Sequence, residues 1–97
     1  MNMIEICVEH LLEGQKIDCD CIKISVDDKE EQRETISFEI ICDLEFSLDL
    51  ILPDWCKNFE THLNGEMVVN LSRDGIVKFD KMWKEGDLLK LILKKWD

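Results

Sequence analysis

Residues 36–52 read ISFEIICDLEFSLDLIL, the most regular pattern in the chain. Apolar side chains occupy nine consecutive even-numbered positions: Ile36, Phe38, Ile40, Cys42, Leu44, Phe46, Leu48, Leu50 and Leu52. The odd-numbered positions between them are mostly polar or acidic. Because successive side chains of a strand point to opposite faces, this alternation predicts β structure with one buried face and one acidic face.

The same segment is too long for one ordinary strand. At ~3.4 Å per residue it would extend roughly 55 Å, whereas most strands extend ~17–20 Å. A loop with an odd number of residues keeps the apolar side chains on one face, so we expect a turn centred on Asp43. One strongly coiled strand is the alternative.

Shorter patterns predict further strands on the N-terminal side. The alternation of Ile4, Ile6 and Val8 indicates a first strand, and Gly14 lies in a turn over residues 11–16. A second strand is expected over residues 17–26. Its apolar side changes from odd to even positions near Ile22, which predicts a bulge or a strand that passes between two layers. Residues 27–34 form a polar, mostly acidic loop.

A helix is expected over residues 54–64. Pro53 ends the β region, Asp54 is a suitable N-cap, and Asn64-Gly65 supplies a C-cap. Apolar or boundary residues recur at spacings of three and four between the caps. They are Trp55, Cys56, Phe59, His62 and Leu63.

The C-terminal third predicts β structure again. Arg73-Asp74-Gly75 favours a three-residue hairpin loop that pairs Leu71 with Val77, and a turn follows at Glu85-Gly86-Asp87. The nearly continuous apolar run over residues 88–93 is typical of a strand covered on both faces. The expected class is therefore α+β. It combines a mainly antiparallel sheet of about five to seven strands with one short helix, in a single domain over residues 1–97.

The net charge of −10 is unevenly distributed. Residues 1–66 carry 17 acids and 5 bases, whereas residues 67–97 carry 5 acids and 7 bases. Such acidity disfavours direct nucleic-acid binding and favours basic partners, although excess acid also simply promotes solubility. There is no secretory signal and no apolar run long enough to span a membrane. We therefore expect a complete, cytoplasmic protein without membrane contact.

The five cysteines do not suggest a disulfide framework, because their number is odd and the chain is expected inside the cell. We expect reduced thiols that behave as small apolar groups. The close pair Cys19 and Cys21 is spaced more tightly than the Cys-x-x-Cys of structural zinc sites. A Cys/His metal site that also uses His10 and His62 stays open as an alternative.

Catalytic motifs are missing from the sequence. There is no phosphate-binding loop, no Ser/His/Asp arrangement and no His-Glu-x-x-His element. Cys56 and His62 lie six residues apart on the expected helix, so they do not face each other. The sequence therefore predicts a protein that is not an enzyme and has no cofactor.

The acidic β face is a candidate contact surface and a possible imitation of nucleic acid. Its carboxylates are spaced by ~6.8 Å at best, against ~1.7 Å per charge in duplex DNA, so it needs support from neighbouring acids. Trp83, expected in a loop, is the candidate aromatic anchor. The predicted partner-binding residues are Asp18, Asp20, Asp27, Asp28, Glu30, Glu31, Glu34, Glu39, Asp43, Glu45, Asp49 and Trp83.

Two C-terminal stretches resemble the second half of ubiquitin-like sulfur carriers. Residues 62–68 (HLNGEMV) and 83–91 (WKEGDLLKL) share with that family an Asn-Gly turn and a Gly-Asp turn before the last strand. The resemblance covers about a third of the chain and implies a β-grasp fold. Since the chain ends in Trp96-Asp97 and not in Gly-Gly, it implies an adaptor or structural module without a conjugating tail.

Size, acidity and the missing motifs together favour a small inhibitor or neutralising protein. Antitoxins, immunity proteins and phage anti-defence proteins belong to this class. Its partner is expected to be a protein with a basic surface, such as a nucleic-acid-binding protein. The β-grasp module and the metal-binding domain are the alternatives.

Overall fold

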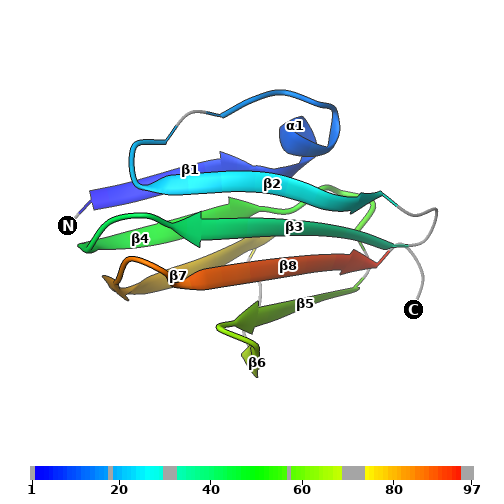
Figure 1. The fold of residues 1–97 in the computed structure, drawn as a ribbon. Coiled ribbons are helices and arrows are strands. Elements are labelled where there is room, and N and C mark those ends of the chain that lie inside the picture. Colours follow the sequence, from blue (N-terminus) through cyan, green and yellow to red (C-terminus); the bar gives the residue numbers. More distant parts are fainter. Residues whose placement is uncertain (1, 18, 30–32, 57, 69–73, 95–97) are drawn as a thin grey trace.

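The computed structural model describes residues 2–17, 19–29, 33–56, 58–68 and 74–94. These ranges contain eight strands and one short helix (Figure 1). In chain order they are β1 (Asn2–Cys7), α1 (Val8–Leu12), β2 (Ile22–Lys29), β3 (Arg33–Ile40), β4 (Leu44–Ile51), β5 (Asn58–Leu63), β6 (Glu66–Val68), β7 (Ile76–Trp83) and β8 (Leu88–Lys94).

The strands form two sheets that lie one behind the other (Figure 1). A three-stranded sheet has the order β1-β4-β7, with β1 parallel and β7 antiparallel to the central β4. A five-stranded antiparallel sheet has the order β2-β3-β8-β5-β6. The molecule is a β sandwich. The prediction of an α+β fold with a single main sheet is therefore wrong.

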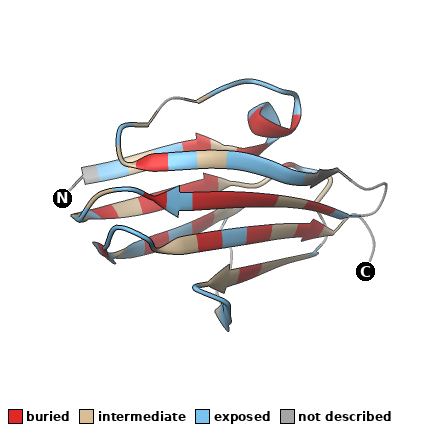
Figure 2. Ribbon diagram, in the orientation of Figure 1, coloured by how far each residue is buried: buried red, intermediate tan, exposed pale blue. Residues whose placement is uncertain are grey.

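The inner faces of both sheets form one apolar core (Figure 2). The three-stranded sheet contributes Ile6, Phe46, Leu48, Leu50, Val77, Phe79 and Trp83, and the five-stranded sheet contributes Ile22, Ile36, Phe38, Ile40, Leu89, Leu91 and Leu93. α1 adds Val8, Leu11 and Leu12. Each large side chain buried in this way stabilises the fold by roughly 1.5–3 kcal/mol before the cost of ordering the chain.

The long alternation of residues 36–52 supplies both sheets. The chain leaves β3 after Ile40 and enters β4 at Leu44, so it breaks at the expected place around Asp43. The two strands do not pair with each other, because β3 lies in the five-stranded sheet and β4 in the three-stranded one. Even-numbered side chains point into the core from both sides, which explains why the pattern continues unbroken across the connection.

The expected helix over residues 54–64 is absent. A turn follows Pro53, in which the Cys56 amide donates to the Pro53 carbonyl oxygen (3.1 Å), and β5 begins at Asn58. Phe59, Thr61 and Leu63 alternate with outward residues, as in a strand. The spacing of four residues between Phe59 and Leu63 also fits a helix, so the pattern of this short segment suits both structures. Pairing with β8 and β6 satisfies the backbone of β5, and tertiary context therefore decides the outcome.

Asn64-Gly65 forms a hairpin turn, not a helix C-cap. Both residues have positive φ angles, 53° and 86°, and they connect the paired residues Leu63 and Glu66. This is the backbone that a two-residue type I′ turn requires, and Asn-Gly is its preferred sequence.

Other local predictions have mixed outcomes. Residues 8–12, at the end of the first expected strand and the start of a turn, form α1, and β2 begins only at Ile22. The irregularity in β2 lies between Val26 and Asp28 and not near Ile22. The turn at Glu85-Gly86-Asp87 is confirmed, with Gly86 at φ 95°. The expected pairing of Leu71 with Val77 falls outside the described residues, and β7 pairs with β4.

Candidate functional site

A polar network joins two turns at one end of the sandwich. The Asp87 carboxylate accepts hydrogen bonds from Asn64 Nδ2 (3.1 Å) and from the Lys84 amide (3.0 Å), and Lys81 Nζ lies 3.4 Å away. Asn64 Oδ1 accepts from the Leu88 amide at 2.8 Å. The β7–β8 turn is thereby tied to the β5–β6 turn. Backbone and side-chain donors together lower the pKa of Asp87.

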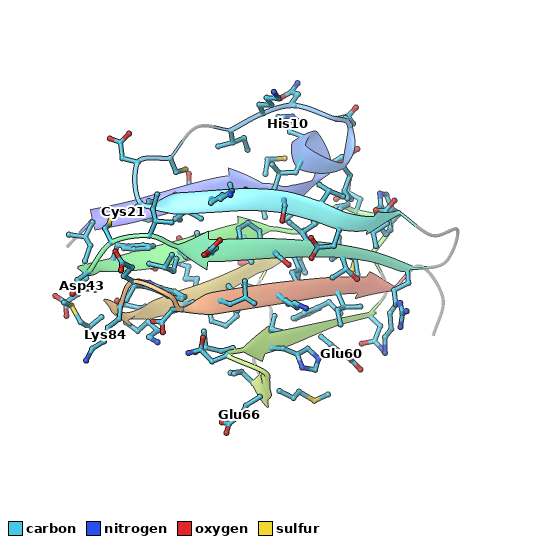
Figure 3. The ribbon with its side chains drawn as sticks, viewed as in Figure 1. His10, Cys21, Asp43, Glu60, Glu66 and Lys84 are labelled. Atoms are coloured by element: carbon cyan, nitrogen blue, oxygen red, sulfur yellow. A yellow bond between two sulfur atoms is a disulfide. The ribbon has the colours of Figure 1, made fainter. Side chains whose placement is uncertain are left out.

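A second hydrogen bond reaches the same end from Asp43, the residue before β4. Asp43 Oδ1 accepts a hydrogen bond from the Glu85 amide (2.8 Å), and Figure 3 shows Asp43 and Lys84 at this end of the molecule. Sequence reasoning missed the structural roles of Asn64 and Asp87. The two turn motifs were visible in the sequence, but their contact across 23 residues was not.

The outer face of the five-stranded sheet carries a row of polar groups. Ser25 and Ser37 both donate to the Asp27 carboxylate, beside the irregularity in β2. Farther along the same face, on β8 and β5, Lys94 Nζ lies 2.9 Å from Glu60, and His62 Nε2 lies 3.5 Å from the same carboxylate. The hydrogen bond from Lys94 is the main cause that lowers the pKa of Glu60.

A shallow depression of about 260 Å³ lies on this face, where β8 meets the β5–β6 hairpin. It is lined by His62, Gly65, Leu88, Lys90 and Ile92. Its walls combine half-buried apolar side chains with one exposed cation, Lys90. Such a surface suits contact with another protein segment better than enclosure of a small molecule, since ligand pockets bury most of the ligand surface.

The titratable groups with shifted pKa values are unsuited to acid or nucleophilic catalysis. A carboxyl group that acts as a general acid near neutral pH needs a raised pKa, whereas the pKa values of Glu60 and Asp87 are shifted downward. Burial raises the pKa of Cys56, which disfavours its reactive thiolate form. Within the described ranges, no group of three or more His, Cys, Asp or Glu side chains could hold a metal ion.

The predicted acidic surface is divided between opposite sides of the sandwich. Asp27 and Glu39 lie on the outer face of the five-stranded sheet, whereas Glu45 and Asp49 lie on the outer face of the three-stranded sheet. The chain crosses between the sheets at residues 41–43, and therefore residues 36–52 do not form one acidic stripe.

The remaining predicted contact residues are also dispersed. Asp20 is exposed just before β2, Asp28 pairs with Thr35 within the hairpin, and Glu34 is buried at the start of β3. Asp49 is only 2% exposed, accepts a hydrogen bond from Ser47 (2.7 Å) and lies 3.9 Å from Lys78 Nζ. Asp18, Glu30 and Glu31 fall outside the described residues.

Trp83 lies in β7 and not in a loop. Its side chain is 0% exposed, its ring stacks on Phe46 with 5.4 Å between centroids, and its indole Nε1 donates to the Phe46 carbonyl oxygen at 3.0 Å. Lys81 Nζ lies 4.9 Å from the ring centroid. Trp83 is therefore a core residue of this domain, and its ring is not available on the surface.

The expectation of five reduced thiols is wrong. Cys21 and Cys42 form a disulfide with 5.3 Å between their Cα atoms, whereas Cys7, Cys19 and Cys56 carry thiols. Because the two cysteines are 21 residues apart, no local sequence pattern indicates that they pair. One of the candidate metal ligands, Cys21, is thus bonded to another cysteine.

The fold defines a β-sandwich domain built from a three-stranded and a five-stranded sheet. The family model of the middle domain of GH127 β-L-arabinofuranosidases matches residues 10–95, and the chain belongs to this family. A comparison with curated proteins gives no match.

Solved structures share the fold. A GH127 β-L-arabinofuranosidase from Geobacillus stearothermophilus T6 is 28% identical with a TM-score of 0.58, and the match covers 74% of this chain and 12% of that enzyme. A GH127 β-arabinofuranosidase is 18% identical with a TM-score of 0.60, over 75% of this chain and 14% of that one. A further glycoside hydrolase is 18% identical with a TM-score of 0.56, over 75% of this chain and 13% of that one. The chain thus spans only about an eighth of these enzymes.

These findings overturn the functional predictions from the sequence. The chain belongs to a family of enzyme domains, so the predictions of a non-enzymatic inhibitor, antitoxin or anti-defence protein with a basic partner are wrong. The β-grasp alternative fails as well, because the chain is a two-sheet sandwich that shares its fold with a GH127 enzyme, and the family match replaces the metal-domain alternative. In the described part of the chain, no helix is long and apolar enough to cross a membrane.

Proposed function

We propose that this chain is the middle domain of a glycoside hydrolase that acts on β-L-arabinofuranosides. The observation that carries this proposal is the family match over residues 10–95, together with the same sandwich fold in a β-L-arabinofuranosidase that is 28% identical.

Within such an enzyme the domain supplies contact surface and not reacting groups. The lowered pKa values of Glu60 and Asp87 keep both carboxylates charged at neutral pH, and both are engaged by neighbouring cations or amides. A glycosidase general acid requires the opposite shift. The reacting groups therefore belong to the part of the enzyme outside this domain.

The test uses the protein at the full length made in its natural host. Purified protein is incubated with 4-nitrophenyl β-L-arabinofuranoside and, as the matched control, with the α anomer. Release of nitrophenol from the β anomer is expected, with at least tenfold slower release from the α anomer. Absence of hydrolysis of the β anomer by folded protein would overturn the proposal.

Three sequence predictions carry over as proposals. We propose that residues 1–97 form one domain, which the single core shared by both sheets supports. The exposed acids Asp20, Glu39, Asp43 and Glu45 are proposed as contact residues within the enzyme. A cytoplasmic location also stays a prediction, against which the Cys21–Cys42 disulfide argues, since disulfides persist mainly in oxidising compartments.

A further inference from the structure

The open edge of the five-stranded sheet borders a groove. β2 is the terminal strand of that sheet, and residues 13–17 and 19–21 lead to it from α1 (Figure 1). Between this connection and β2 lies a groove of about 760 Å³. Its apolar lining comes from both sides and consists of Leu11, Ile17, Cys19, Ile22, Ile24, Val26 and Ile41.

The hydrogen-bond ladder shows which backbone groups of β2 face the groove. The Ile41 amide donates to the Cys21 carbonyl oxygen (2.9 Å). Because hydrogen-bonded positions recur at every second residue of an antiparallel strand, Lys23 and Ser25 also direct their backbone groups toward β3. In an antiparallel pair the intervening residues point their amides and carbonyls away from the partner strand. Those of Ile24 and Val26 are therefore directed toward the open edge.

The neighbouring connection covers only the beginning of this edge. Cys19 forms a bridge with Ile22, and no further bridge to β2 occurs among the described residues of the connection. Val26 and Ile41 are exposed large apolar residues, at 36% and 43%. Natural proteins usually block or cover an open, apolar strand edge, because it pairs readily with other chains.

We propose that this groove receives an extended segment from the rest of the enzyme, which adds to the sheet as a strand beside Ile24 and Val26. The inference rests on the proposed function, because the segment comes from the large part of the polypeptide that relatives have outside this domain: the chain covers 12–14% of their length. Main-chain hydrogen bonds hold such a strand, and alternate side chains select it.

The chemistry of the groove describes the segment. Its inward side chains are apolar, because they meet Ile17, Ile24 and Val26. Lys16 and Lys23 line the same groove with a single described acid, Asp20, in the otherwise strongly acidic first two-thirds of the chain. An acidic outward side chain on the added strand is therefore favoured. The irregularity between Val26 and Asp28 ends the regular pairing edge.

Hydrogen exchange, measured in the isolated 97-residue chain and in the full-length natural protein, tests the proposal. In the isolated chain, the amides of Ile24 and Val26 should exchange fast while those of Lys23 and Ser25, which face β3, stay protected. In the full-length protein, exchange at Ile24 and Val26 should slow at least tenfold. Equal exchange of these two amides in both proteins would overturn the proposal.

Substitution of Val26 sharpens this test. In the full-length protein, Val26→Pro removes an amide that faces the groove, and Ile24 exchange should return toward its rate in the isolated chain. Val26→Thr keeps the amide and should retain protection. Circular dichroism of both isolated variants checks that the sandwich still folds. If Val26→Pro folds and Ile24 stays protected, no strand is added at this edge.

Two further outcomes separate this proposal from the proposed function. Hydrolysis of the β-L-arabinofuranoside without protection of Ile24 and Val26 overturns the strand addition alone, and protection without hydrolysis overturns the enzymatic function alone. Protection of the edge already in the isolated chain, together with a dimer in sedimentation, would identify a second copy as the occupant and overturn the proposal.

Discussion

Asp87 shows at the scale of a single residue how one carboxylate holds two turns together. It accepts hydrogen bonds from the Asn64 side chain and the Lys84 amide, and it lies beside Lys81. Hydrogen bonds to a charged acceptor contribute roughly 1.5–3 kcal/mol each to stability. When the acceptor is lost, the donors bond to water or stay without a hydrogen bond.

Asp87→Asn should lower the free energy of unfolding by about 1–2 kcal/mol, measured by urea denaturation at pH 7. Because the folded pKa of Asp87 is lowered, its stabilisation is complete above the ordinary aspartate pKa of about 3.9 and is lost as the pH falls through the folded pKa. The difference between variant and wild type should therefore vanish under strongly acidic conditions. Asp80→Asn, at an exposed position of β7, is the control and should change stability by less than ~0.5 kcal/mol.

Trp83 makes a second prediction at this scale. Trp83→Phe keeps an aromatic ring in the core but removes the donor to the buried Phe46 carbonyl oxygen. We expect a loss of roughly 2 kcal/mol, from the unsatisfied carbonyl and from the unfilled volume. Thermal denaturation measures it. Met82→Ala, at an exposed neighbour in the same strand, should have little effect, and an equal loss there would contradict the argument.

Among the elements, the connection from β3 to β4 is anchored by the Cys21–Cys42 disulfide, which joins it to the segment before β2. A crosslink over 21 residues restricts the unfolded chain by roughly 3 kcal/mol. It also lies next to the groove at the β2 edge, whose lining includes the neighbouring residues Ile22 and Ile41.

Reduction should therefore lower the free energy of unfolding by about 3 kcal/mol, and the Cys21→Ala/Cys42→Ala double variant should be insensitive to reductant. Thiol titration in denaturant without reductant should find three thiols in the oxidised protein, since five cysteines include one disulfide. Five thiols in protein purified under air would contradict the pairing.

Element by element, the sequence predicts strands better than their arrangement. The alternation of residues 36–52 and the turn at Gly86 are visible because they depend on local periodicity and turn chemistry. The assignment of β3 and β4 to opposite sheets is not visible in the sequence. Even-numbered residues would face the core whether the two strands shared one sheet or lay in two. The sequence predicts a helix across residues 58–63 because Phe59 and Leu63 satisfy a helical spacing, although both also obey the alternation of a strand.

The site was less predictable than the fold. The acids were identified as a surface from their spacing in the chain, but the crossover at Asp43 puts Glu39 and Glu45 on opposite faces. Asp87 accepts a hydrogen bond from Asn64, which lies 23 residues away, and no local sequence pattern reveals this contact. Membership of the GH127 middle-domain family is shown by the match over residues 10–95, and none of the catalytic motifs considered in the sequence indicates it.

At the scale of the whole molecule, one core joins both sheets, and neither sheet can bury its inner face without the other. We expect cooperative unfolding in which far-ultraviolet circular dichroism and near-ultraviolet aromatic dichroism give the same urea midpoint. The aromatic signal includes that of Trp83 packed on Phe46, whereas the far-ultraviolet signal reports all strands. Midpoints that differ by more than experimental error would show that the two sheets unfold separately.

The connection of residues 41–43 relates the inward-facing positions of β3 to those of β4. Side chains on both of its sides must keep the same parity, because β3 and β4 face the core from opposite directions with even-numbered residues. An inserted residue that stays extended would turn either Phe38 or Leu48 toward water, whereas two such residues would preserve both. A single inserted residue must therefore bulge out of a connection in which Ile41 and Cys42 are already held by the Cys21 carbonyl oxygen and by the disulfide.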